Sequence, residues 1–249
     1  MAGYAGFRVA RFLWSPRLRR EVRPPRMKRI FDAACRRCPR LAAFLDAVRI
    51  AEPDYYCRPV PPFGDPEARL LIVGLAPGMH GANRSGRPFT GDYAGILLYA
   101  TLHKFGLATA PVSVSVRDGL ELAGARITNA VKCLPPANKP LPVEIKECND
   151  YLRTELEQSP QVRAILALGT IAHGAVLRAL DLKPAQFRFA HGAEHALSAG
   201  RTLLDSYHCS RYNTQTRRLT PEMFEAVVQR GRELALLPKH GDEQRSKAV

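Results

Sequence analysis

Four short apolar runs, each ending in polar or glycine residues, mark the middle and the second half of the chain. Each run is nearly continuous rather than alternating, which is typical of a strand buried on both faces. The runs are RLLIVG (69–74), ARITNAV (125–131), RAILALG (163–169) and RTLLDSYH (201–208). The pattern therefore predicts a sheet of about four central strands.

Longer segments with apolar residues at three- and four-residue steps lie between and after these runs, and this spacing is typical of helices with one buried face. They are YAGILLYATLHKFG (93–106), PVEIKECNDYLRTELEQ (142–158), TIAHGAVLRAL (170–180) and PEMFEAVVQRGRELALL (221–237). Residues 27–50 have similar spacing and predict two helical pieces joined at a pair of cysteines. The proline-rich residues 55–68 predict a loop.

Strands that alternate with helices predict an α/β domain, here a three-layer α/β/α fold with a central parallel sheet. We expect this domain to span 27–237, between a basic N-terminal arm at 1–26 and a polar tail at 238–249. Ligands of such sheets bind at the C-terminal ends of the strands. The loops after the first, second and fourth runs are therefore the expected site: GLAPGMHG (74–81), TNAVKC (128–133) and HCSRYN (208–213).

The charge of the chain favours a polyanionic partner. Its 249 residues include 37 Lys and Arg against 23 Asp and Glu, a formal net charge of +14 at pH 7. Nucleic acid is the leading partner, and a merely basic surface is the alternative. No apolar run approaches the roughly 20 residues of a membrane helix, so we expect no membrane contact. We expect a cytoplasmic monomer associated with nucleic acid; the arginine-rich arm leaves organellar targeting as an alternative.

The six cysteines do not suggest a disulfide framework in a chain of this length without a secretion signal, so their spacing is examined for metal binding. Cys35 and Cys38 form a C-x2-C pair, and Cys133 and Cys148 lie far downstream. Cysteines also pack as small apolar groups, so the pair alone is weak evidence.

The glycine-rich loop GLAPGMHGANRSGRPFTGD (74–92) matches neither the phosphate-binding P-loop nor the dinucleotide-binding pattern. Its residues suit a pocket for a nucleobase instead. Phe89 offers a ring for stacking, backbone N–H groups around Gly78 can contact polar atoms, and the Asn129 amide can pair with a base edge. His208 can donate to an oxygen that gains negative charge.

Several ordered segments together resemble the family 5 uracil-DNA glycosylases of the uracil-DNA glycosylase superfamily, over about residues 28–236. They are CRRCPRL (35–41), PPFGDPEARLLIVG (61–74), the loop 74–92, ITNAVKCLPPANKP (127–140) and SYHCSRYNTQT (206–216). The resemblance implies a monofunctional DNA glycosylase that hydrolyses the N-glycosidic bond of uracil, and of hypoxanthine or related lesions, and leaves an abasic site for base excision repair.

The resemblance also implies roles for single residues. Asn129 reads the edge of the base, Phe89 stacks on it, and His208 stabilises the departing base. The remaining base-binding positions are Gly74, Ala76, Pro77 and Gly78. The positions expected to contact DNA are Arg84, Arg87, Ser210, Arg211, Tyr212 and Asn213. A loop-capping Asn129, a core Phe89 and a solvated turn at 211–212 are the structural alternatives.

The attacking water needs a residue that holds it, because Ala76 stands where sister families place Asp, Glu or Asn. Asp92 is the candidate, with His80 as a second polar group, and an N-terminal helix cap is the alternative for Asp92. The superfamily's usual His-Pro-Ser loop reads His208-Cys209-Ser210 here, so the proline that stiffens it is absent.

The resemblance further implies a [4Fe-4S] cluster held by Cys35, Cys38, Cys133 and Cys148. Spacing alone leaves a zinc ion with the same four ligands open. Two other functions remain as alternatives: an iron-sulfur electron carrier, and an iron-sulfur protein that binds nucleic acid without glycosylase activity.

Overall fold

A computed structural model describes residues 29–237, and the predicted arm at 1–26 and tail at 238–249 lie outside them. The strands are β1 (Phe63–Gly64), β2 (Leu70–Gly74), β3 (Ala125–Asn129), β4 (Ala164–Leu168), β5 (Glu194–Ala196) and β6 (Thr202–Ser206). The α-helices are α1 (Pro39–Ala51), α2 (Ala82–Ser85), α3 (Tyr93–Lys104), α4 (Pro142–Glu157), α5 (Thr170–Ala179), α6 (Arg211–Gln215) and α7 (Pro221–Leu236). Short 3-10 helices lie at Pro136–Asn138, Pro184–Gln186 and Ser198–Gly200.

The strands form one six-stranded sheet in the order β1-β3-β2-β4-β6-β5. The four central strands are parallel, and β1 and β5 pair antiparallel at the two edges. The predicted central strands are therefore confirmed. The two edge strands were missed because they are only two and three residues long, too short to give a pattern.

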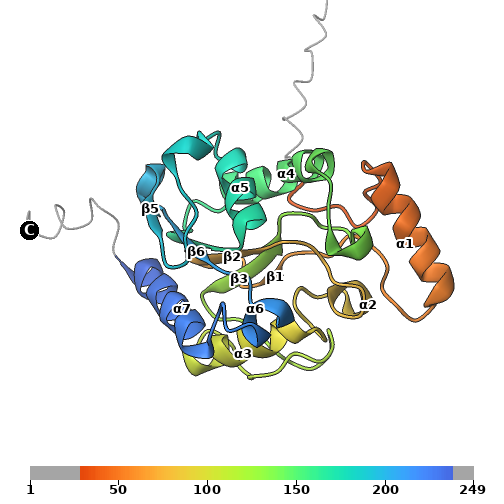
Figure 1. The fold of residues 1–249 in the computed structure, drawn as a ribbon, viewed down its shortest axis with the longest axis horizontal. Helices are drawn as coiled ribbons and strands as arrows, with labels where there is room; N and C mark the ends of the chain where they lie inside the picture. Colours follow the sequence, from red (N-terminus) through yellow and green to blue (C-terminus); the bar gives the residue numbers. More distant parts are fainter. Residues whose placement is uncertain (1–28, 238–249) are drawn as a thin grey trace, which may run out of the picture.

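Helices cover both faces of the sheet, as Figure 1 shows, with α4 and α5 on one side and α3 and α7 on the other. Alternate residues of β2 point to opposite layers: Leu70 and Ile72 pack with α3 and α7, and Leu71 and Val73 pack with α4 and α5. This is the predicted three-layer α/β/α fold. No helix among residues 29–237 is long and apolar enough to cross a membrane.

The predicted helix over the first part of 27–50 is wrong within the described residues. The helix begins only at Pro39, with Cys38 as its N-cap, and residues 29–38 form turns and extended chain. Asp32 accepts a hydrogen bond from the Ala34 N–H, a local turn that competes with a helix. Both Cys35 and Cys38 thus lie on a loop.

Candidate active site

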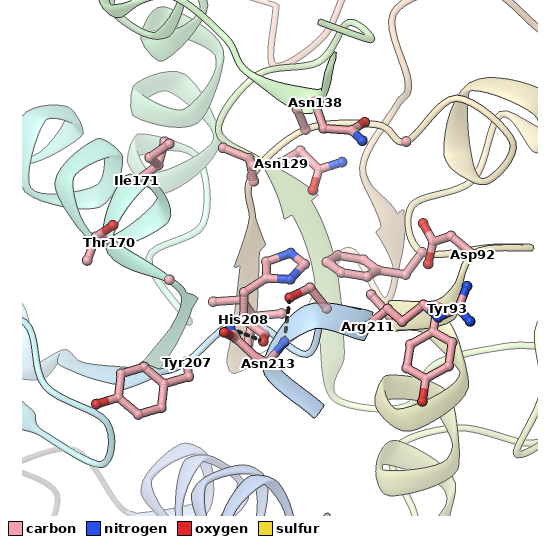
Figure 2. A pocket seen from close by; sticks show the side chains of 18 of the residues that line it. Asp92, Tyr93, Asn129, Asn138, Thr170, Ile171, Tyr207, His208, Arg211 and Asn213 are labelled. Carbon is pink, nitrogen blue, oxygen red and sulfur yellow. Dashed lines mark hydrogen bonds between the residues drawn. The ribbon is translucent and has the colours of Figure 1, made fainter. Parts of the chain in front are cut away.

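A cavity of about 490 Å³ lies at the C-terminal edge of the sheet, where the loops after β2, β3, β4 and β6 meet. Figure 2 shows residues from these loops around it, with Asn129 and Asn138 on one side, Asp92 on another and His208 near the middle. Its position agrees with the rule that parallel α/β sheets bind ligands at the ends of their strands.

Phe89 forms part of the cavity wall in a backbone conformation that is rare for a residue with a side chain. Its φ is +55°, and its ring stacks beside that of His208 with 5.9 Å between centroids and 29° between planes. The glycine at position 74 makes this placement possible, because a Cβ there would meet both the Phe89 ring and Asn129 Oδ1. Backbone strain held at a cavity wall is typical of functional sites.

Asn129 ends β3 with its side chain buried beside the cavity. Its Oδ1 atom is buried and has no hydrogen-bond partner among the residues that the structure describes. A buried amide oxygen without a partner costs free energy, so such atoms are rare unless a ligand or water completes them. Asn129 lines the cavity, so this amide lies at its wall beside the Phe89 ring with an oxygen that the described chain does not engage.

Asp92 has two separate environments for its two carboxylate oxygens. Oδ1 accepts the Gly95 N–H at 2.9 Å as the N-cap of α3. The other oxygen, Oδ2, lies close to Gly78 and Gly81, where the chain has no side chain in the way. Burial raises the pKa of Asp92, and the hydrogen bond from Gly95 opposes this only in part. Asp92 therefore caps helix α3 and also lines the cavity.

His208 is a neutral imidazole at physiological pH, because desolvation lowers its pKa to about 4. A neutral ring donates from only one nitrogen, so it can give a hydrogen bond without bringing a positive charge. The loop around His208 has no proline to stiffen it, and other contacts hold it in place instead. Cys209 is fully buried, the Asn213 side chain donates to His208 O at 2.8 Å, and Ser210 caps α6.

The structure brings most of the predicted site residues to this one cavity. Gly78, Phe89, Asp92, Asn129 and His208 line it, and Gly74 lies behind Phe89. The other predicted residues on its wall are Ala76, Ser210, Arg211 and Asn213. Predicted residues that do not line it are Pro77, His80, Arg84, Arg87 and Tyr212.

One of these predictions needs correction. Arg87 is only 5% exposed and pairs with Asp118 at 2.8 Å, so it stabilises the protein interior and is not free to contact DNA. His80 is exposed, its Nδ1 lies 2.8 Å from Tyr55 Oη, and it does not line the cavity, so its role in holding water stays a prediction. Arg84 and Tyr212 are exposed, and Tyr212 shows 70% of its surface, as a DNA contact requires.

The cavity also has lining residues that sequence reasoning missed: Asn138, Thr170, Ile171, Phe189, Tyr207 and Arg218. Thr170 and Ile171 follow β4, and the rule that placed the other loops at the site applies equally to this one. Phe189 and Arg218 come from segments without any motif, and only the folded chain brings them to the cavity.

The four predicted ligand cysteines surround a second, smaller cavity between the loop 35–38, the loop after β3 and helix α4. Cys35 and Cys38 are half-buried, and Cys133 and Cys148 are buried. Burial and the nearby thiols raise the pKa of Cys38 to about 11 and the pKa of Cys133 further. These raised pKa values keep the thiols protonated unless a bound cation stabilises the thiolates.

Comparison with known proteins identifies the family. A family model described as "Uracil DNA glycosylase superfamily" matches residues 61–231. The chain is 50% identical to the Type-5 uracil-DNA glycosylase of Thermus thermophilus over 207 residues, covering 81% of this chain and 94% of that protein.

Two further relatives agree. The Type-5 uracil-DNA glycosylase of Pyrobaculum aerophilum is 45% identical over 79% of this chain and 87% of its own length. That of Mycobacterium bovis is 44% identical over 82% of this chain and 79% of its own. The chain therefore belongs to the type-5 uracil-DNA glycosylases of the uracil-DNA glycosylase superfamily.

Proposed function

We propose that this chain is a DNA glycosylase that hydrolyses the bond between a deaminated base and its deoxyribose and leaves an abasic site. Its family membership supports the class of reaction, since the relatives are named uracil-DNA glycosylases. One observation of this chain carries the assignment of residues: a stacking ring, an unpaired buried amide oxygen, a carboxylate and a neutral imidazole surround one cavity.

The base must leave the DNA stack to reach these groups. In the cavity it stacks on Phe89 and pairs with the Asn129 amide, whose Oδ1 accepts from the base N–H and whose NH2 donates to a base carbonyl oxygen. Both groups are fixed before the base arrives, because Gly74 lets them approach and the surrounding core is packed. Positioning of this kind lowers the entropy cost of reaching the transition state.

His208 stabilises the leaving base. As the glycosidic bond stretches, negative charge develops on the base and positive charge on the sugar. A neutral imidazole whose N–H points at the base oxygen strengthens its hydrogen bond as that charge grows. The lowered pKa of His208 keeps the ring in this neutral form near neutral pH.

Asp92 positions the water that attacks the sugar. Its Oδ1 is engaged as a helix cap, so Oδ2 is the atom available to hold the water and accept its proton. The raised pKa of Asp92 brings this carboxylate closer to the pH at which a base accepts a proton efficiently.

Simple hydrolysis is favoured over strand cleavage through a lysine adduct. Lys132 is the lysine nearest to Asn129 in sequence, yet it is 1% exposed, hydrogen-bonded to Thr128 and 3.7 Å from Glu155. No lysine among the described residues lines the cavity, so none stands where it could attack the sugar.

We also propose that Cys35, Cys38, Cys133 and Cys148 hold a [4Fe-4S] cluster. Four thiolates complete such a cluster, and these four cysteines line one cavity. The resemblance to the family supports the cluster over a zinc ion with the same four ligands. Because hydrolysis moves no electron, the cluster would serve to join the loop 35–38 and α4 to the segment that follows Asn129.

We expect hypoxanthine to be a substrate together with uracil. The small residues Ala76 and Gly78 line the cavity together with Asp92, so this part of the wall carries no large side chain at those two positions. A bicyclic purine needs this additional room.

The test is base release by the purified chain from oligonucleotides that contain uracil, hypoxanthine or an unmodified base. Release of uracil that is lost in Asn129→Ala, while the fold persists by circular dichroism, supports the proposal. Binding to DNA without any base release contradicts it. Release of uracil with no release of hypoxanthine contradicts only the wider substrate range.

A further inference from the structure

The active-site cavity extends beyond the groups that hold the base. Figure 2 shows Thr170, Ile171 and Tyr207 on the opposite side of His208 from Asp92. Phe189 and Arg218 line the same cavity. These five residues define what we call the far compartment. The whole cavity, at about 490 Å³, exceeds what one pyrimidine base fills and lies within the range that holds larger ligands.

The far compartment offers one aromatic ring to a ligand. The Tyr207 ring already contacts two side chains. His191 stacks on it with 5.1 Å between centroids, and the Arg218 guanidinium carbon lies 4.5 Å from the ring centre. Phe189 lies tilted beside Tyr207 at 6.2 Å and is only half-buried. The surface that remains is therefore the Phe189 ring, and the apolar Ile171 and a cation, Arg218, also line the cavity.

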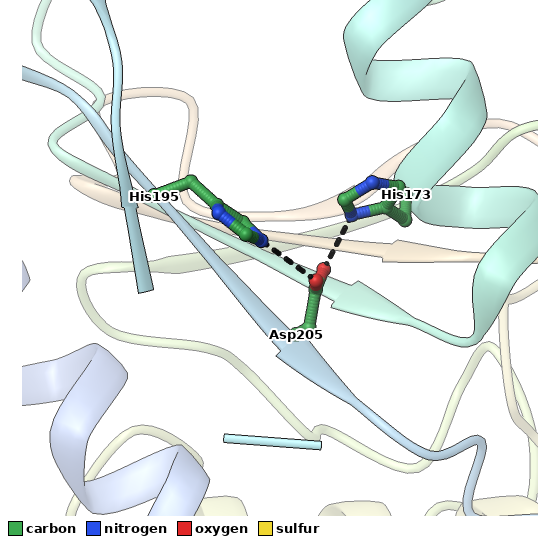
Figure 3. Close-up of side chains that lie close together, drawn as sticks. All are labelled: His173, His195 and Asp205. Carbon is green, nitrogen blue, oxygen red and sulfur yellow. Dashed lines mark hydrogen bonds and ion pairs between the residues drawn. The ribbon is translucent and has the colours of Figure 1, made fainter. Parts of the chain in front are cut away.

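A cluster behind this wall holds the segment that carries Phe189. Figure 3 shows Asp205 of β6 between His173 of α5 and His195 of β5. The Asp205 carboxylate lies 2.8 Å from His173 Nδ1 and 3.1 Å from His195 Nε2. His173 Nε2 also lies 3.0 Å from the Phe187 carbonyl oxygen, and its ring meets the Phe189 ring edge to face at 5.6 Å.

The hydrogen-bond partners determine the charge of this cluster. The Phe187 carbonyl and the Asp205 carboxylate both accept hydrogen bonds, so both nitrogens of His173 must donate, and His173 is a cation paired with the fully buried Asp205. A buried ion pair that satisfies all its hydrogen bonds is rigid, and removing one partner is costly. The position of Phe189 at the cavity is therefore held by three elements of the fold.

We propose that the far compartment is a subsite for the nucleobase next to the excised one, which stacks on Phe189 while its phosphate lies near Arg218. The substrate is a polymer, so a compartment continuous with the base pocket is filled by a neighbouring nucleotide of the same strand. Aromatic rings interleaved with cations are the recurring means of holding unpaired bases. This subsite rests on the proposed glycosylase function and adds to it a contact outside the excised nucleotide.

The experiment compares three uracil-containing single-stranded oligonucleotides in single-turnover base release: an intact one and two in which the 5′ or the 3′ neighbour is an abasic analogue. For the unmodified protein, we expect one of the two analogues to raise the half-saturating protein concentration by about tenfold or more, the scale of one base–aromatic stack. The maximal rate should hold, because the base-release groups are untouched.

Variants then assign the effect to Phe189. Phe189→Leu should raise the half-saturating concentration for the intact oligonucleotide and make it insensitive to the abasic neighbour, and Phe189→Tyr should restore the sensitivity. Phe187→Leu is the matched control, since Phe187 packs against His195 and does not line the cavity. Equal sensitivity in Phe189→Leu and the unmodified protein, or no sensitivity to either analogue, overturns the subsite.

The two proposals fail separately. If neither the unmodified protein nor any variant releases uracil, the glycosylase assignment has failed. The same oligonucleotides, measured by fluorescence anisotropy, then still report whether Phe189 senses the neighbouring base. Uracil release at full rate with no role for the neighbour leaves the glycosylase assignment intact and removes the subsite alone.

Discussion

Asp92 illustrates how one residue can satisfy a structural and a chemical interpretation at the same time. The sequence left a helix cap and a water-positioning base as alternatives for it. In the structure its two oxygens divide these tasks, with Oδ1 on the Gly95 N–H and Oδ2 toward Gly78. Sequence spacing does not show this division, because it depends on the direction in which the carboxylate turns.

Substitution of Asp92 by Asn separates the two tasks. An asparagine oxygen can still cap α3, so folding should hold, while the loss of the proton acceptor should lower the single-turnover rate of uracil release by about 10²-fold. Rapid-quench kinetics, with thermal unfolding as the control for the cap, make the measurement. A near-normal rate would leave Asp92 as a cap only.

The pH dependence of the rate tests the protonation of His208 and Asp92. With its pKa lowered to about 4, His208 stays neutral down to about that pH, and its protonation should cost no activity between pH 5 and 8. Asp92 must be ionised, and its pKa is raised, so the rate should fall as the pH drops toward that pKa. His208→Ala should lose about 10²- to 10³-fold at each pH, since it removes one oriented donor.

A single-turnover profile from pH 4.5 to 8.5 distinguishes these assignments. The acid limb should be absent in Asp92→Asn and retained in His208→Ala. An acid limb that disappears in His208→Ala instead would assign it to the imidazole.

At the scale of helices and strands, the local pattern of apolar residues was sufficient to predict the long elements. Helices α3, α4, α5 and α7 and the four central strands agree with their predicted ranges within a few residues. The missed elements have a common cause, because short elements depend on their partners. Strand β5 exists through its pairing with β6, and α6, in a segment that we expected to be a loop, is a single turn capped by Ser210.

The same limit applies to side chains whose partner is distant in sequence. Arg87 stands in the glycine-rich loop beside Phe89 and looks like a DNA contact. Its partner Asp118 comes 31 residues later, in a segment without a motif, and only folding brings the two together. The motif residues Phe89, Asn129 and His208 could be predicted from the sequence because they belong to a family pattern, and Asn129 and His208 also lie at or just after strand ends.

The pair of His173 and Asp205 predicts a pH-dependent contribution to stability. Burial lowers the pKa of His173, but the hydrogen bond and charge of Asp205 outweigh this, so its pKa is raised in the folded state. The folded state then holds the proton more tightly than the unfolded chain. The stabilisation is full below the unfolded pKa of about 6.5 and declines as the pH rises through the folded value.

His173→Gln should therefore lower the free energy of unfolding by about 3 kcal/mol at pH 6, the scale of an unpaired buried charge, and by less at pH 9. Urea titrations at both pH values measure the difference. Because His195 also contacts Asp205, His195→Gln is the matched control for loss of a single hydrogen bond and should cost less. An equal loss at both pH values would show that His173 is neutral in the fold.

The proposed iron-sulfur cluster leads to a prediction about how the helices are joined. A cluster on Cys35, Cys38, Cys133 and Cys148 would tie the start of α1 to α4, which ion pairs such as Arg40 with Glu144 at 2.7 Å already hold together. Purified protein should be brown, with a broad absorbance that is lost in Cys133→Ser and unchanged in Cys57→Ser, since Cys57 does not line that cavity. Colourless protein with stoichiometric zinc and full activity would contradict the cluster.

At the scale of the whole molecule, we expect net charge to govern how the protein finds DNA. A formal net charge of +14 attracts a polyanion over the length of the chain, whereas the cavity acts on one nucleotide. Each phosphate neutralised releases counterions, so log K against log[salt] should have a slope of about −0.9 for each phosphate contacted in a duplex.

The arm at 1–26 carries seven arginines against one glutamate, which makes it the segment most suited to this electrostatic task. Removing it should reduce the steepness of the salt slope by several phosphate contacts and weaken binding at low salt. The maximal single-turnover rate should stay the same, because every residue assigned to the chemistry lies beyond position 73. Anisotropy titrations of full-length and shortened protein between 50 and 200 mM salt, about the range over which such contacts are lost, test this. Unchanged slopes would mean that the arm does not touch DNA and that the basic surface of the folded domain accounts for the affinity.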